Sequence, residues 1–160
     1  MSGRPEVPQF GALLRTHIDS VPTTARPAFL AGLERSAAAR YRDWAARAPQ
    51  WAEELLGCAR REDEIADLVD GLFPVSADDR AAVDRALPAA IELYYEVFSP
   101  YGLDDQLYLQ SEAELQGALA WVRLGEAIDS PRAVEILARC TDLERESSVV
   151  VQDLLASVAR

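Results

Sequence analysis

The sequence predicts an all-α protein: a four-helix bundle built from two antiparallel helical hairpins, with a short N-terminal helix and a helical crossover. The first observation is that the segments between prolines and glycines are dense in helix formers, and none alternates with the period of two that a strand requires. The second is that four long segments carry apolar residues in alternating steps of three and four, the pattern of a bundle-facing stripe. The third is that the two hairpins repeat one another in sequence.

The limits of each element follow from helix start and stop signals. Ser130 and Pro131, for example, give the last helix a favourable N-cap and first position. The turns within each hairpin are very short, which makes the paired helices antiparallel. We predict one domain over 1–160. Its four bundle helices cover 26–47, 49–73, 104–129 and 131–158, and they form hairpins at 26–73 and 104–158. A short helix over 9–19 precedes them, and a connecting helix over 78–98 joins the hairpins.

Composition and charge exclude several classes of partner. The 160 residues are 49% hydrophobic and 27% charged, which fits a globular chain. All 16 bases are Arg, against 27 acids, and the formal net charge of −11 argues against nucleic-acid binding. No apolar run approaches the roughly 18 residues of a membrane span, and the N-terminus lacks the apolar core of a signal peptide. We therefore expect a cytoplasmic protein with no nucleic-acid and no membrane partner.

The internal repeat pairs chemistry-bearing residues of the two hairpins. Cys58 and Glu62 in the second helix recur, at a constant offset, as Cys140 and Glu144 in the last helix. The first helix of each hairpin matches in the same way, and pairs Glu34 with Glu114 and Tyr41 with Trp121. The repeat implies a bundle with pseudo-two-fold symmetry. The two cysteines would then lie on opposite sides of the centre, so a disulfide between them is not expected.

Each apolar stripe is interrupted by one glutamate. These residues are Glu34, Glu62, Glu114 and Glu144. Four carboxylates facing one core cannot all stay ionised and unpaired, because an isolated buried charge costs several kcal/mol. A hard cation such as Mg, Mn or Fe could neutralise them, protons could do so by raised pKa values, or the bundle could be open around a ligand. The remaining alternative is that some of them lie on the surface.

This pattern resembles the ferritin-like superfamily, which places one Glu on each of two helices and a Glu-x-x-His on each of the other two. Glu34 and Glu114 match the single-Glu positions, and Glu62 and Glu144 begin the other two motifs. Both histidines are absent, and their positions hold the residues Ile65 and Ser147. The resemblance covers about 26–73 and 104–158. It implies a four-helix bundle with a core metal site for Fe or Mn.

Two main functions follow, and no catalytic residue is assigned for either. The first is a metal-dependent (Fe or Mn) oxidase or oxygenase whose ligands are the four glutamates. The second is a metal-free bundle that has lost the site and binds a small molecule or a protein partner. A third hypothesis is a non-enzymatic homodimer that docks through the helix near the N-terminus. The residues predicted to line the pocket are Tyr41, Cys58, Ile65, Trp121, Cys140 and Ser147.

Overall fold

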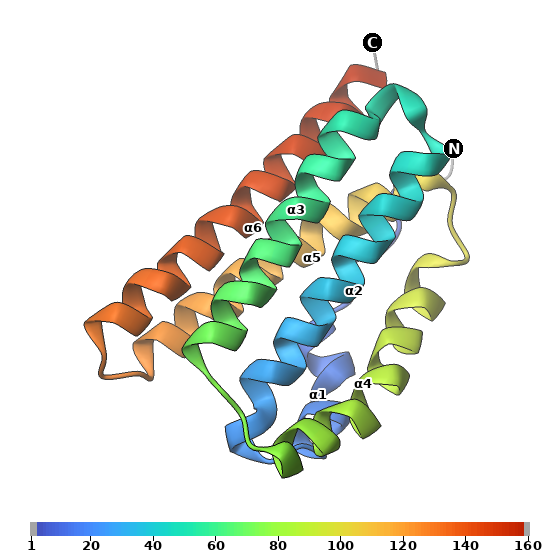
Figure 1. Cartoon of the computed structure of the whole chain (residues 1–160). Helices are drawn as coiled ribbons and strands as arrows, with labels where there is room; N and C mark the ends of the chain where they lie inside the picture. Colours follow the sequence, from blue (N-terminus) through green and yellow to red (C-terminus); the bar gives the residue numbers. More distant parts are fainter. Residues whose placement is uncertain (1–2, 159–160) are drawn as a thin grey trace.

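The computed structural model describes residues 3–158, and within this range every regular element is helical (Figure 1). The elements are α1 Phe10–Asp19, η1 Thr23–Ala25, α2 Arg26–Arg47, η2 Pro49–Trp51, α3 Ala52–Leu72, α4 Ala77–Phe98, α5 Leu103–Glu126 and α6 Pro131–Val158. The all-α prediction is therefore confirmed. The limits predicted for α2 and the start predicted for α6 are also confirmed. Helix α6 continues to Val158, the last residue described, whereas α5 ends at Glu126, before the predicted limit at Asp129.

The long helices pack as two hairpins that contact each other through α3 and α6 and through side chains of α2 and α5. Helix α2 lies along α3, α5 lies along α6, and α3 and α6 pack against each other (Figure 1). Helix α4 connects the hairpins and packs on α2. Helix α1 contacts α4 and α5, and its Phe10 and Leu14 are buried within the chain. Most of the apolar face of α1 is thus used inside the protein, while Leu13 on the same helix is exposed, and the homodimer hypothesis stays a prediction.

The glutamates lie between two apolar clusters. One cluster contains Tyr41, Cys58 and Val151, and the other contains Ile65 and Cys140. Along each bundle helix the glutamate follows residues of one cluster and precedes residues of the other. The alternating three-and-four phase explains this, because a residue on the bundle-facing stripe must lie in the core whatever its polarity. The bundle therefore has a polar layer enclosed by apolar packing on both sides.

None of the helices within residues 3–158 combines the length and the low polarity needed to cross a bilayer.

Candidate metal centre

Three of the four stripe glutamates converge on one point. One carboxylate oxygen each from Glu34, Glu62 and Glu144 lies within 4.8 Å of the other two. These residues come from α2, α3 and α6, so the site joins the two hairpins. Glu62 and Glu144 are fully buried, while Glu34 keeps part of its surface exposed. The structure thus places these acids in the bundle and not on its surface.

Glu114 is the fourth acid of the layer and is held differently. It is buried on α5, but it is not one of the three carboxylates that share the 4.8 Å separation. The Tyr41 hydroxyl donates to its Oε1 at 2.7 Å, and the Gln110 amide donates to the same oxygen at 2.6 Å. Two neutral donors therefore fix the orientation of Glu114 beside the other three acids.

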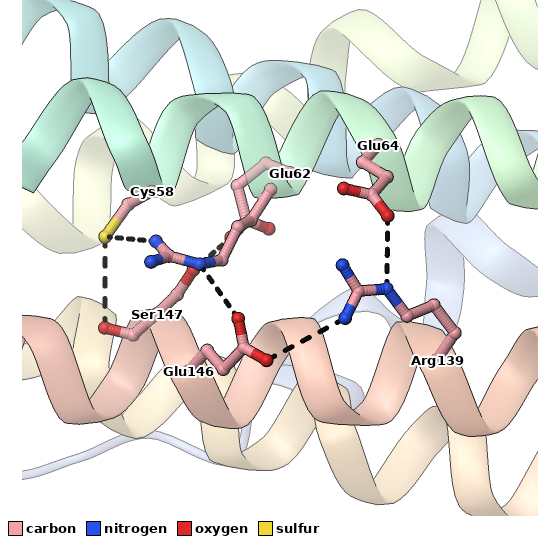
Figure 2. Close-up of polar contacts among 7 residues, drawn as sticks. Cys58, Glu62, Glu64, Arg139, Glu146 and Ser147 are labelled. Atoms are coloured by element: carbon pink, nitrogen blue, oxygen red, sulfur yellow. Dashed lines mark hydrogen bonds and ion pairs between the residues drawn. The ribbon is translucent and has the colours of Figure 1, made fainter.

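The carboxylates of Glu62 and Glu144 are also oriented, each by one donor. The Ser147 hydroxyl donates to Oε1 of Glu62 at 3.1 Å (Figure 2). The Trp121 indole N–H donates to Oε1 of Glu144 at 2.8 Å. The second oxygen of Glu62, Oε2, is buried and has no hydrogen-bond partner among the described residues. A buried acceptor without a partner is rare in folded proteins, so this atom calls for a proton or a cation.

A glycine makes room for the carboxylate of Glu144. A Cβ atom at Gly117 would lie 2.6 Å from Oε1 of Glu144 and 3.0 Å from its Cδ. A Cβ atom essentially never approaches a non-bonded oxygen this closely, so any other residue at this position would displace Glu144. Gly117 on α5 therefore positions the Glu144 carboxylate by leaving space for it.

The two positions where the resemblance implied histidine have separate roles. Ile65 is fully buried in one apolar cluster and offers no ligand atom. Ser147 crosses from α6 to the Glu62 carboxylate on α3. The pseudo-two-fold symmetry is therefore broken, because Glu62 receives a hydroxyl from this position and Glu144 receives the Trp121 indole instead.

The two cysteines are buried free thiols. The Cys58 thiol donates to the Ser147 carbonyl oxygen at 3.9 Å, and Arg61 Nη1 donates to its sulfur at 3.7 Å (Figure 2). Burial raises the pKa of Cys58 to about 11 and that of Cys140 to about 12. Thiols this weakly acidic stay protonated at neutral pH, which disfavours them as nucleophiles or metal ligands. Their role is packing, and the expectation of no disulfide between them is confirmed for this structure.

Burial and mutual repulsion raise the pKa values of Glu34, Glu62 and Glu144. Burial, followed by the charge of Glu114, raises the pKa of Glu34 to about 8. The same two causes, in that order, raise the pKa of Glu62 well above its usual range. For Glu144 the causes of the raised pKa are burial and then the charge of Glu34. Without a cation, these carboxyls therefore retain protons at neutral pH.

The site includes a buried arginine that the stripe analysis missed. Arg40 precedes Tyr41 on α2, and its guanidinium donates to Ser36 Oγ and to Gln110 Oε1, both at 3.2 Å. It lies over the ring of Tyr94, 4.9 Å from the centroid. Arg40 lies outside the stripe because it faces the connecting helix α4. Ser36 lies four positions before Arg40, and this spacing places the two side chains on the same face of a helix. That spacing is the signal in the sequence that could have indicated their contact.

A pocket leads from the surface to the carboxylates. It has a volume of about 570 Å³ and is lined by residues of α1, α2, α4, α5 and α6. Of the acids described above, Glu34, Glu114 and Glu144 line it, and of the predicted pocket residues only Trp121 does so. The other predicted pocket residues, Tyr41, Cys58, Ile65, Cys140 and Ser147, are buried behind the carboxylates in the described structure. These five residues do not line this pocket, whose opening lies on the α1 side, and their role as pocket residues stays a prediction.

Comparison of the chain with family models, with curated proteins and with solved structures found no match in any of the three. Functional inference therefore rests on the site itself.

Proposed function

We propose that this protein is a divergent ferritin-like bundle whose carboxylates bind a hard divalent cation, Mn or Fe. The proposed activity is oxidation of a small molecule that enters through the pocket. One observation carries the proposal: a fully buried carboxylate oxygen, Oε2 of Glu62, has no hydrogen-bond partner in the described structure and belongs to a group of three converging acids. A cation would satisfy that oxygen and neutralise its neighbours together.

The geometry of the acids fits a single small ion. Hard divalent cations bind oxygen at about 2.0 to 2.6 Å, so ligand oxygens around one ion lie within about 4 to 5 Å of each other. The separation of at most 4.8 Å among Glu34, Glu62 and Glu144 falls in that range. An all-oxygen ligand set without imidazole favours Mn, Fe or Mg over Cu or Zn. Glu114, fixed by Tyr41 and Gln110, would be the fourth acid beside the ion.

Neighbouring residues would orient the ligands. Ser147 and Trp121 each donate to one oxygen of a ligand, and such contacts fix the direction of the remaining oxygen. When bound, Mn or Fe supplies one-electron chemistry with oxygen. The contribution of the chain is to hold the ligands, to keep water out on the side of Tyr41 and Ile65, and to leave an approach to the carboxylates on the side of α1.

The packing of the helices supports the ferritin-like arrangement. Two hairpins joined through α3 and α6, with α4 as the connection between them, are the layout that the resemblance implies. The internal repeat of the hairpins and the position of one glutamate per helix support the same arrangement.

A metal-free protein is the second candidate, because protons could satisfy the same acids. The raised pKa values of Glu62 and Glu144 mean that these carboxyls can stay neutral and share protons at neutral pH. The pocket would then serve binding alone, with no redox chemistry. Metal analysis separates the two candidates.

The test is the metal content of protein purified without chelator, loaded anaerobically with Mn(II) or Fe(II), and desalted. We expect one or two ions per chain in the wild type and none in the double variant Glu62→Gln, Glu144→Gln. The matched control is Glu64→Gln, Glu146→Gln, which removes two exposed acids that lie two positions further along the same helices (Figure 2). These exposed ion pairs contribute little to stability, so the control should bind metal normally. A wild type without metal, or an equal loss in the control, would contradict the proposal.

A further inference from the structure

The pocket has a charge pattern unlike the rest of the chain. The chain carries 27 acids and 16 bases. Among the described residues, the acids that line the pocket are Glu34, Glu114 and Glu144. Three arginines line it: Arg15 and Arg123, which are exposed, and Arg40, which is buried. An anion approaching this opening therefore meets positive charge before it reaches the carboxylate layer, which favours its entry.

Arg40 is a buried cation without an ion-pair partner. Its side chain is only 4% exposed, and no acid of the described residues forms an ion pair with it. Its two terminal nitrogens contact the neutral groups of Ser36 and Gln110, while its Nε has no hydrogen-bond partner in residues 3–158. The charge of Arg40 acts on the Glu34 carboxyl, but no ion pair joins the two side chains, so a direct carboxylate contact to this guanidinium is unfilled among the described residues. The planar fork of the guanidinium is suited to a carboxylate.

Much of the remaining pocket wall is apolar, although Gln9, Gln110 and Gln116 also line it. Helix α1 contributes Phe10, Leu14 and Ile18, and helix α2 contributes Leu30 and Leu33. The volume of about 570 Å³ lies within the range of roughly 300 to 1,000 Å³ typical of small-molecule sites. A hydrocarbon body would pack against these side chains while its charged end reached Arg40.

We propose that this pocket binds a small organic carboxylate with an apolar body, whose carboxylate contacts Arg40 and whose body lies along α1 and α2. That this anion is the substrate class of the metal centre rests on the function proposed above; its binding to the pocket does not. A single buried guanidinium beside a largely apolar wall suits a singly charged carboxylate with an apolar body.

The test compares three probes of equal chain length on the wild-type protein by isothermal titration calorimetry: octanoate, 1-octanol and octylamine. Because a hydrogen bond to a charged group is stronger than one to a neutral group, octanoate should bind about tenfold more tightly than 1-octanol, and octylamine should bind most weakly. Equal affinity of octanoate and 1-octanol, preference for octylamine, or no binding of octanoate at millimolar concentration would each overturn the proposal. This comparison needs no variant and so does not depend on how a substitution folds.

Substitutions then locate the anion. Arg40→Gln should weaken octanoate about tenfold or more and leave 1-octanol unchanged, whereas a general disturbance of the pocket would weaken both. The exposed pair Arg15→Gln, Arg123→Gln should weaken octanoate several-fold at low salt, and less at high salt because the charges are screened. The matched control Arg60→Gln, Arg132→Gln changes the net charge equally at exposed positions outside the pocket lining. An equal loss of octanoate in this control, or no loss in Arg40→Gln, would contradict the assignment.

Each titration is run with chelator and again with Mn(II). Octanoate binding that persists in chelator supports Arg40 as the contact, even if no metal binds and the proposed metal function fails. Octanoate binding that requires Mn(II) would overturn the role of Arg40 and place the carboxylate on the metal. If octanoate binds in neither condition, the proposed substrate class is wrong. A positive metal analysis would still support the metal centre in that case.

Discussion

The metal-free protein is expected to lose stability as the pH rises from about 5 to about 8. Glu34 and Glu62 have folded-state pKa values above their usual value of 4.5, about 8 for Glu34. Between the unfolded and folded pKa values, the folded state holds protons that the unfolded state has released. The stability tied to those protons is complete below about pH 4.5 and is lost as the pH rises through the folded pKa. Each such group contributes a slope of about 1.4 kcal/mol per pH unit.

Urea denaturation in chelator at pH 5, 6, 7 and 8 measures this slope. In Glu62→Gln one group no longer titrates, so its free energy of unfolding should depend less on pH. The control Glu64→Gln removes an exposed acid next to it on α3 and should keep the wild-type slope. If wild type and Glu62→Gln have the same slope, Glu62 does not hold a proton in the folded protein.

Mn(II) is expected to raise the melting temperature of the chelated protein at neutral pH. A ligand at about 100 times its dissociation constant stabilises the folded state by about 2.7 kcal/mol. For a chain of 160 residues, that corresponds to a rise in Tm of about 5 to 11 °C. The gain should grow as the pH increases from 6 to 8, because protons compete with the metal for the same oxygens.

Thermal unfolding followed by circular dichroism, with and without Mn(II), gives this shift. The double variant Glu62→Gln, Glu144→Gln should show none, and the control Glu64→Gln, Glu146→Gln should show the full shift. An equal rise of Tm in the double variant would place the bound Mn(II) elsewhere on this acidic chain.

The sequence was sufficient to predict the helices and the burial of the stripe glutamates. Both depend on local signals: the limits of α2 and the start of α6 on turn residues, and the burial of Glu62 and Glu144 on helical phase. Periodicity fixes which face a residue occupies, so a polar residue within a stripe is buried with its apolar neighbours.

The burial of Arg40 and the position of the pocket could not be predicted from helical periodicity. Arg40 is one position away from the stripe, and its burial depends on Tyr94 and Phe98 of α4 lying over it. The pocket exists because α1 packs against α4 and α5 and leaves space in front of Glu34. Both features depend on contacts between helices far apart in the chain, which no local pattern encodes.

The hydrogen-bond partners within the site could not be predicted from the sequence either. Sequence symmetry pairs Tyr41 with Trp121, yet one donates to Glu114 on the opposite hairpin and the other to Glu144 within its own hairpin. The repeat therefore predicts which residues lie near the centre but not which acid each one contacts. Those choices depend on side-chain packing, including the space left by Gly117.

If the buried carboxyls exchange their protons for a divalent cation, metal binding must release protons, and this release can be measured. Mn(II) is titrated into chelator-free protein at pH 7 by isothermal titration calorimetry, in buffers with different enthalpies of ionisation. We expect saturable binding with release of at least one proton per ion, and neither in the Glu62→Gln, Glu144→Gln variant. Absence of binding, or binding that releases no proton and persists in the variant, would contradict this exchange of protons for metal.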